Sequence, residues 1–350
     1  MSVKVSGERN VSYDILRIVM CIFVIAIHTQ PVEYLENHKF IGASILPVLY
    51  LCNPLFFMIS GKFNLSKSFE TANNILKFYK NKLIKIVIPW LVYSALYYTW
   101  NIIDQHTYIG IKVFVKDFVK NMLSNNVSFH FWFMYALFGM LVSTPFLAIL
   151  LNNMTISQQK LLFYIATIWM ICSSGLPSLK IDFGANNFFL SGWIYFYYAG
   201  WYLAKENNTK KNHWLYLAGI VGYFITIVAT LWYPDYAYGR DWAISYIVFS
   251  FAVYVFVIMH FNVPISWLRQ VVSYLSKRTF SVYMLHTIVI IYISRLNVVK
   301  IPNKLINYLV TMITIFFVSA FISYFIDALI NLVVQFVKNL SISKKLKYGA

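Results

Sequence analysis

Residues 11–30 read VSYDILRIVMCIFVIAIHTQ, an apolar stretch of the length that crosses a bilayer as a helix. It nevertheless carries Asp14, Arg17 and His28. Ionisable side chains within a membrane cost several kcal/mol and are found mainly where they line a polar cavity or a functional site. The stretch therefore predicts a membrane-spanning helix and a candidate site together. The alternative is that all three are helix-end residues at the interface, with Arg17 reaching the headgroups.

Apolar runs of similar length recur along the whole chain. Of its 350 residues, 60% are apolar and only 12% are charged. We expect an all-α, polytopic integral membrane protein that forms one membrane domain over residues 1–350, with about ten transmembrane helices. The expected spans are residues 11–30, 42–61, 83–101, 129–151, 160–177, 188–204, 213–233, 243–262, 279–295 and 305–337.

The net charge of +17 comes from lysines and arginines clustered in short loops between these runs. This distribution predicts contact with anionic lipid and no nucleic-acid partner, and it places both termini in the cytoplasm. Arg295, Lys300 and Lys304 do not follow this distribution, because the expected spans place them on the outer side of the membrane. The amphipathic segment 114–123 is too short to span, and we expect it along the outer membrane surface. The cysteines show no disulfide or metal-site spacing.

Two cytoplasmic stretches are more polar than packing requires. Ser60 and Gly61 end the second expected span and allow a close approach of another backbone. Lys82 and Lys85 share one helical face at i, i+3 spacing, which suits a phosphate-bearing ligand. A solvated basic edge or a contact with lipid explains the two lysines equally well.

Two further stretches carry polar residues inside apolar spans. The fourth expected span opens with an aromatic group that contains His130, Trp132 and Tyr135. In the ninth, Tyr283 and His286 lie at i, i+3 spacing and should point the same way, into the protein.

An ordered set of motifs across nearly the whole chain resembles the acyltransferase 3 family, membrane enzymes that O-acylate bacterial surface polysaccharides. No single motif is specific, but their order is. The chain is most similar to the short members without an appended soluble domain, of the type that O-acetylates enterobacterial common antigen. The matching motifs are Asp14 to Arg17 followed by His28, Pro54 to Lys62, His130 to Phe133, Tyr195 to Leu203, and Ser276 to His286.

The resemblance implies acetyl-CoA or another acyl-CoA as donor substrate on the cytoplasmic side, and no bound cofactor or metal. It implies a hydroxyl of a surface polysaccharide, or of its lipid-linked precursor, as acceptor, and the bacterial cytoplasmic membrane as location. Two departures concern the donor contacts. Lys82 and Lys85 stand where the family often has two arginines, and lysine lacks the bidentate fork. Asp327 stands where a glutamate followed by proline is common.

Acyl transfer to a hydroxyl needs a base and donors for the oxyanion. His28 is the candidate base, because imidazole titrates near neutral pH; an acyl-histidine intermediate stays open. Asp14 lies about 21 Å from His28 along a straight helix, so the two form no dyad. We expect Asp14 and Arg17 at the mouth where acyl-CoA enters. The candidates for a supporting polar site are Ser60, His130, Trp132, Tyr135, Ser281, Tyr283, His286 and Asp327.

Two other classes of protein are compatible with these residues. In a transporter or flippase, Arg17, His28, His286 and Asp327 would line a proton or substrate path. Transporters usually show paired halves, and the sequence has no second copy of the Asp14 to His28 pattern. A non-catalytic subunit of polysaccharide assembly would tolerate loss of His28.

Overall fold

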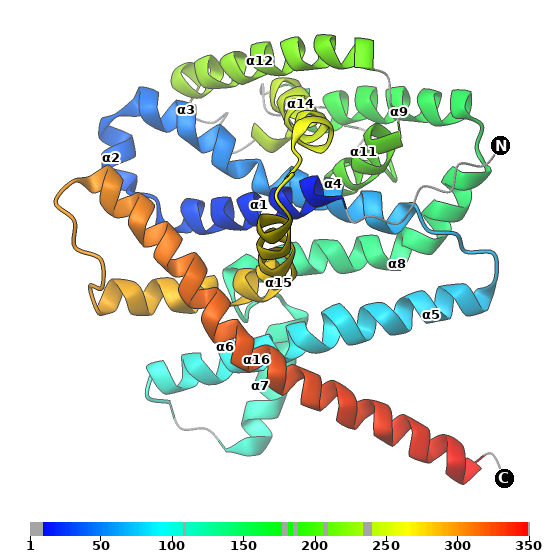
Figure 1. Ribbon diagram of the computed structural model, residues 1–350, viewed down its shortest axis with the longest axis vertical. Helices are drawn as coiled ribbons and strands as arrows, with labels where there is room; N and C mark the ends of the chain where they lie inside the picture. The colour runs from blue at the N-terminus through cyan, green and yellow to red at the C-terminus, as the bar shows by residue number, and fades with distance from the viewer. Residues whose placement is uncertain are drawn as a thin grey trace. The chain divides into compact units, whose positions relative to one another are not determined.

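The computed structural model describes residues 10–107, 110–176, 181, 183–184, 188–205, 209–233 and 240–348, in which helices joined by turns and loops occur without any β-strand (Figure 1). The predicted all-α class is confirmed. The described residues group into two compact units. Unit 1 takes its residues from Met1–Lys67, Leu151–Thr279 and Val299–Ile313, and unit 2 takes its residues from Ser68–Leu150, Phe280–Val298 and Thr314–Ala350.

The first half of the chain contains α1 (Val11–Thr29), α2 (Val32–Asn37), α3 (Lys39–Tyr50), α4 (Cys52–Leu65), α5 (Ala72–Lys82), the π-helical turn η1 (Leu83–Val87), α6 (Ile88–Asp104), α7 (Ile111–Leu123), the 3₁₀ turn η2 (Phe129–Phe131) and α8 (Trp132–Asn153). The second half contains α9 (Ile156–Met170), the π-helical turn η3 (Ile171–Gly175), α11 (Trp193–Lys205), α12 (Thr209–Trp232), the 3₁₀ turn η4 (Arg240–Trp242), α14 (Ile244–His260), α15 (Ser266–Arg295) and α16 (Lys304–Tyr348).

Six helical stretches within the described ranges are long and apolar enough to cross a membrane: Val11–Thr29, Lys39–Leu65, Ala72–Asp104, Phe129–Asn153, Asn212–Trp232 and Lys304–Gln335. The chain is a multi-pass membrane protein. α14, with 17 residues, is a shorter apolar helix. The expected spans 160–177, 188–204 and 279–295 coincide largely with α9, α11 and α15, and residue 177 lies outside the described residues. The count of ten spans stays a prediction.

The helices add detail within two of the expected spans. The span placed at 42–61 is broken at Leu51 into α3 and α4. The ring of Pro54 would meet the carbonyl of residue 50, which explains why the first helix stops there. The span placed at 279–295 belongs to a helix that begins at Ser266, because its charged first half is amphipathic rather than a loop.

Within unit 1, α4 and α11 approach through glycine. A Cβ added at Gly61 would lie 1.7 Å from the Tyr197 carbonyl oxygen, and one added at Gly200 would lie 2.1 Å from the Met58 carbonyl oxygen. α12 and α14 also lie side by side (Figure 1), with Gly222 against the backbone of Ser245. Small residues permit this contact, which confirms the close approach expected at Gly61.

Tyrosines fill the core of unit 1, and their hydroxyls are satisfied by backbone carbonyls. Tyr198 donates to Gln159 O at 3.1 Å, Tyr246 to Pro47 O at 3.0 Å, and Tyr254 to Gly200 O at 3.1 Å. All three tyrosines are fully buried. Each hydroxyl therefore joins two helices without leaving an unsatisfied polar group.

Unit 2 contains one helical run from Ala72 to Asp104 in which the π-helical turn η1 precedes Pro89. Proline has no N–H for the usual helical bond, and a local change of helix type accommodates it. At the other end of α6, Asp104 accepts two bonds from the Arg295 guanidinium, at 2.5 and 2.9 Å. Arg295, one of the cations on the unexpected side, is thus charge-paired.

α7 packs its aromatic face on α6. The rings of Phe114 and Phe118 lie 5.1 and 5.5 Å from the ring of Tyr98. Ile111, Val115 and Leu123 are exposed on the same helix. The helix covers the amphipathic segment expected at 114–123, and its place on the outer membrane surface stays a prediction.

Gly200→Ala should destabilise the protein by about 1–3 kcal/mol, because its methyl group has no room beside Met58. Thermal unfolding of the detergent-purified protein, followed by tryptophan fluorescence, measures the loss. Gly139→Ala is the matched control, since a Cβ at Gly139 meets nothing within 4 Å. Equal melting temperatures for the two variants would contradict the close packing of α4 and α11.

Candidate active site

The N-terminal end of α1 in unit 1 holds a buried ion pair. Asn10 caps the helix by accepting the Ser12 N–H at 2.9 Å, and the next turn carries Asp14, which is 1% exposed. Arg17 Nη1 donates to Asp14 Oδ1 at 3.1 Å, and the Ser276 hydroxyl donates to the same oxygen at 2.7 Å. A buried carboxylate requires such partners, so Asp14 is not an interfacial charge exposed to solvent.

Arg17 is held on its other side by an aromatic ring. Its guanidinium carbon lies 4.7 Å above the centre of the Phe63 ring from α4, and its side chain is 28% exposed. The arginine is therefore fixed by α1 and α4, with part of it accessible.

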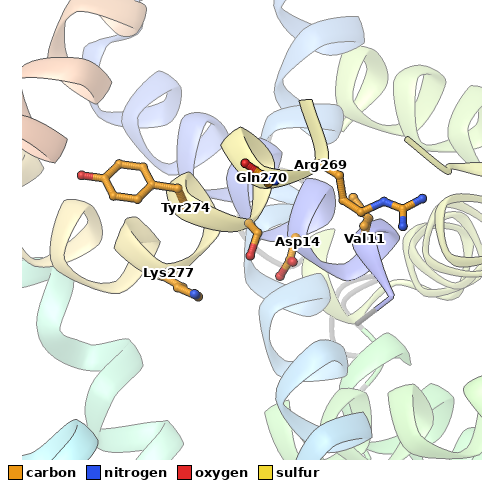
Figure 2. A pocket seen from close by; sticks show the side chains of 7 residues that line it. Val11, Asp14, Arg269, Gln270, Tyr274 and Lys277 are labelled. Atoms are coloured by element: carbon orange, nitrogen blue, oxygen red, sulfur yellow. The ribbon is translucent and has the colours of Figure 1, made fainter. Parts of the chain in front are cut away.

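Beside this ion pair lies a pocket of about 400 Å³ between α1 and the first half of α15 (Figure 2). A second pocket, of about 320 Å³, shares Val11 and Arg269 with it. The first pocket is lined by Val11, Asp14, Arg269, Gln270, Ser273, Tyr274 and Lys277, and the second by Asn10, Val11, Ser12, Ile258, Met259, Phe261, Asn262 and Arg269.

His28 lies at the opposite end of α1, in its last turn, and is half-buried. The helix is continuous from Val11 to Thr29, so Asp14 and His28 are separated by about 21 Å along it. Tyr308, in the first turns of α16, donates to the carbonyl of Ala26 at 2.9 Å. Ser60 is half-buried in α4, and its carbonyl accepts a bond from Asn64 at 2.8 Å.

Unit 2 contains a buried cluster built around His130 and His286, which are 2% and 0% exposed. Their ring centres lie 4.9 Å apart with the rings nearly perpendicular. The Tyr283 hydroxyl donates to the His130 carbonyl, and His286 Nδ1 lies 2.6 Å from the Tyr283 carbonyl. The i, i+3 spacing thus brings Tyr283 and His286 to one place, as the sequence predicts.

Hydroxyl groups border this histidine cluster. Ser128 Oγ lies 2.9 Å and Thr287 Oγ1 3.5 Å from His130 Nδ1. Tyr97 of α6 hydrogen-bonds Thr287, and its ring centre lies 5.3 Å from that of His130. The cluster therefore joins α6, the 3₁₀ turn η2 that precedes α8, and the second half of α15.

Asp327 of α16 accepts bonds from two other helices of unit 2. Ser281 Oγ donates at 2.7 Å, and the Tyr93 hydroxyl donates at 3.3 Å, both to Oδ1. Tyr135 instead takes part in packing. Its hydroxyl donates to the Met122 carbonyl, and its ring centre lies 5.4 Å from that of Trp90. Trp132 begins α8 and is half-buried.

The two expected phosphate-binding lysines lie in unit 2, Lys82 as the last residue of α5 and Lys85 in the turn η1 that follows. Lys82 Nζ is 5.2 Å above the Phe78 ring, and Lys85 is exposed within the π-helical turn. Asp14 and Arg17 belong to unit 1. The residues expected to contact acyl-CoA thus belong to two different units of the chain.

Sequence reasoning quoted Ser276 as the first residue of a family motif but did not assign it as the partner of Asp14, and it gave no site role to the residues of α15 that line the pocket. Their spacing carries a signal, because positions 269, 273, 276 and 277 fall on one helical face once the helix is extended to Ser266. Tyr93 and Tyr97, four residues apart on α6, were also missed.

Comparison with known proteins places these residues in a family. A stretch of 175 residues, 48% of this chain, is 27% identical to the serine/alanine racemase of Enterococcus gallinarum and covers 23% of that protein, so the chain spans less than a quarter of its length. No solved structure matches the chain. The family model described as an acyltransferase domain, acyltransferase 3, matches residues 10–328, which include every candidate site residue. The chain therefore belongs to the acyltransferase 3 family.

Proposed function

We propose that this chain is an O-acyltransferase that moves an acyl group, acetyl in the first instance, from acyl-CoA to a hydroxyl of a cell-surface polysaccharide or its lipid-linked precursor. The observation that carries the proposal is the family match over residues 10–328 of a multi-pass membrane chain. The likeness to the short O-acetyltransferases of surface antigens supports a glycan acceptor. We do not propose racemase activity for this chain, because the aligned stretch covers only 23% of that protein.

In the proposed reaction, His28 takes the proton from the acceptor hydroxyl as its oxygen attacks the thioester carbonyl. The tetrahedral oxyanion then collapses, and the CoA sulfur leaves with the proton that His28 returns. The half-buried position of His28 near the end of α1 supports this role, because it leaves the imidazole accessible. A covalent acyl-histidine is the alternative within the same class.

On the donor side, we propose that Asp14 and Arg17 shape the entrance and that Lys82 and Lys85 attract the phosphates. The ion pair of Asp14 with Arg17 and the bond from Ser276 support a rigid entrance. The exposure of Lys85 supports contact with a water-soluble donor. We place the protein in the bacterial cytoplasmic membrane with both termini inside.

His28→Ala should reduce glycan acylation at least about a hundredfold, the scale of a lost general base. The readout is mass spectrometry of the polysaccharide, with the amount of protein in membranes measured in parallel. His213→Ala, at an exposed histidine of α12, is the matched control and should acylate normally. Near-normal acylation by the His28 variant would refute its role as base.

Lys82→Ala/Lys85→Ala should raise the KM for acyl-CoA with little change in kcat, since these charges meet phosphates far from the reacting carbonyl. Steady-state kinetics in detergent measures both constants. Lys77→Ala/Lys80→Ala removes two exposed lysines with the same spacing from the same helix and serves as control. An equal KM for the two double variants would show that Lys82 and Lys85 have no specific role in binding acyl-CoA.

The proposed orientation places Lys67 in the cytoplasm and Lys39 outside. Single cysteines at these exposed positions, in a background with Cys21, Cys52 and Cys172 replaced by alanine, should react from opposite sides with an impermeant thiol reagent. Reaction of both from outside intact cells would contradict the orientation.

The rival transport function is tested with sealed vesicles and radiolabelled acetyl-CoA. An acyltransferase passes the label to the glycan and releases CoA, whereas a flippase moves an unmodified substrate. Translocation without acceptor-dependent CoA release would favour transport.

A further inference from the structure

The two pockets at the N-terminal end of α1 meet at one arginine. Val11 and Arg269 line both, so the two pockets adjoin along α1, the end of α14 and the start of α15, and together they are called here the Arg269 groove. The groove lies wholly within unit 1. Its larger part, about 400 Å³, is within the range of roughly 300–1,000 Å³ found for small-molecule sites.

The groove carries a net positive charge, because the charge of Asp14 is balanced by Arg17. Asp14 is the acidic residue of the larger pocket, and its Oδ1 already accepts from Arg17 and Ser276. Arg269 and Lys277 contribute two further cations, and Figure 2 shows them on either side of Asp14. The groove therefore favours an anion over a cation.

Arg269 is oriented by the backbone. Its Nε and Nη2 donate to the Val263 carbonyl at 3.3 and 3.2 Å, which uses two of the five guanidinium N–H groups. A guanidinium fixed in this way is suited to grip a second acceptor through its remaining donors. Gln270 and Ser273 add neutral hydrogen-bonding groups on the same helix.

The outer face of the same helix segment is apolar. Trp267, Val271 and Tyr274 are 63%, 44% and 54% exposed and follow one another at i, i+4, i+7 spacing. Aromatic residues with this exposure are typical of the boundary between lipid and water. The groove thus opens where a polar helix face adjoins an apolar one.

We propose that the Arg269 groove binds a phosphate ester, with Arg269 and Lys277 as its charged contacts. A phosphate offers the paired oxygens that a guanidinium holds and the charge that an ammonium attracts. Two sources share this chemistry: the phosphates of a soluble nucleotide such as CoA, or the headgroup of an anionic lipid. The nucleotide source rests on the proposed function, and the lipid source does not.

The test measures binding by the full-length protein in a non-ionic detergent. Arg269→Gln/Lys277→Gln removes both charges, and glutamine keeps a donor for the Val263 carbonyl. Lys39→Gln/Lys160→Gln is the matched control, because both lysines are exposed in unit 1 and line neither pocket. Lys277→Gln alone, at an exposed position, provides a variant with minimal risk to folding.

Two probes separate the sources. Equilibrium dialysis measures binding of adenosine 3′,5′-bisphosphate, and native mass spectrometry counts bound phosphatidylglycerol, with phosphatidylcholine as the comparison lipid. The double variant should lose at least about tenfold in affinity for the nucleotide, or one bound phosphatidylglycerol, while the control behaves as wild type. Loss of the nucleotide alone assigns the soluble source, loss of the lipid alone assigns the headgroup, and loss of both supports one phosphate site open to either.

Unchanged binding of both probes by the double variant would overturn the proposal. Neither probe is an acyl thioester, and neither readout requires turnover. Unchanged binding by the groove variant would therefore not contradict the proposed acyltransferase activity. Normal acylation by the His28 variant would likewise not contradict lipid binding in the groove.

Discussion

The constraint on which unit 1 depends is a carboxylate buried in a membrane-spanning helix. Asp14 is 1% exposed and needs donors, which Arg17 supplies from its own helix and Ser276 supplies from α15. The bond from Ser276 sets the rotation of α15 about its axis. Ser273 and Arg269, one and two turns earlier, then fall on the side of the groove. One buried charge thus holds the polar face of α15 against α1.

Unit 2 also brings hydrogen-bond donors from several helices to its buried polar groups. His130 and His286 lie among hydroxyls and carbonyls contributed by Tyr283 and Thr287, and Asp327 accepts from two hydroxyl groups on different helices. A buried hydroxyl group costs little free energy of folding when it donates a hydrogen bond. Such networks favour a single arrangement of the helices that contribute to them.

Packing between the helices relies on small residues and on tyrosine. Lipid tails are as apolar as leucine, so association of helices depends on close contact and hydrogen bonds rather than on burial of apolar surface. Gly61 and Gly200 bring α4 and α11 into backbone contact, and Tyr254 donates to the Gly200 carbonyl. The guanidinium of Arg295, a cation that the loop charges leave unexplained, is paired with the Asp104 carboxylate.

The sequence by itself determined the all-α membrane class, the family, and local facts such as the shared face of Tyr283 and His286, because hydropathy and helical spacing are written along the chain. It did not show the break at Leu51 or the extension of α15 back to Ser266, since a charged amphipathic helix resembles a loop and a proline break depends on its neighbours. Only the tertiary structure decided that Ser276 is the partner of Asp14 and that Tyr93 and Ser281 meet at Asp327. These pairs are separated by 262, 234 and 46 residues, so no local pattern reports them; each forms because a buried polar group must find a donor wherever the fold brings one.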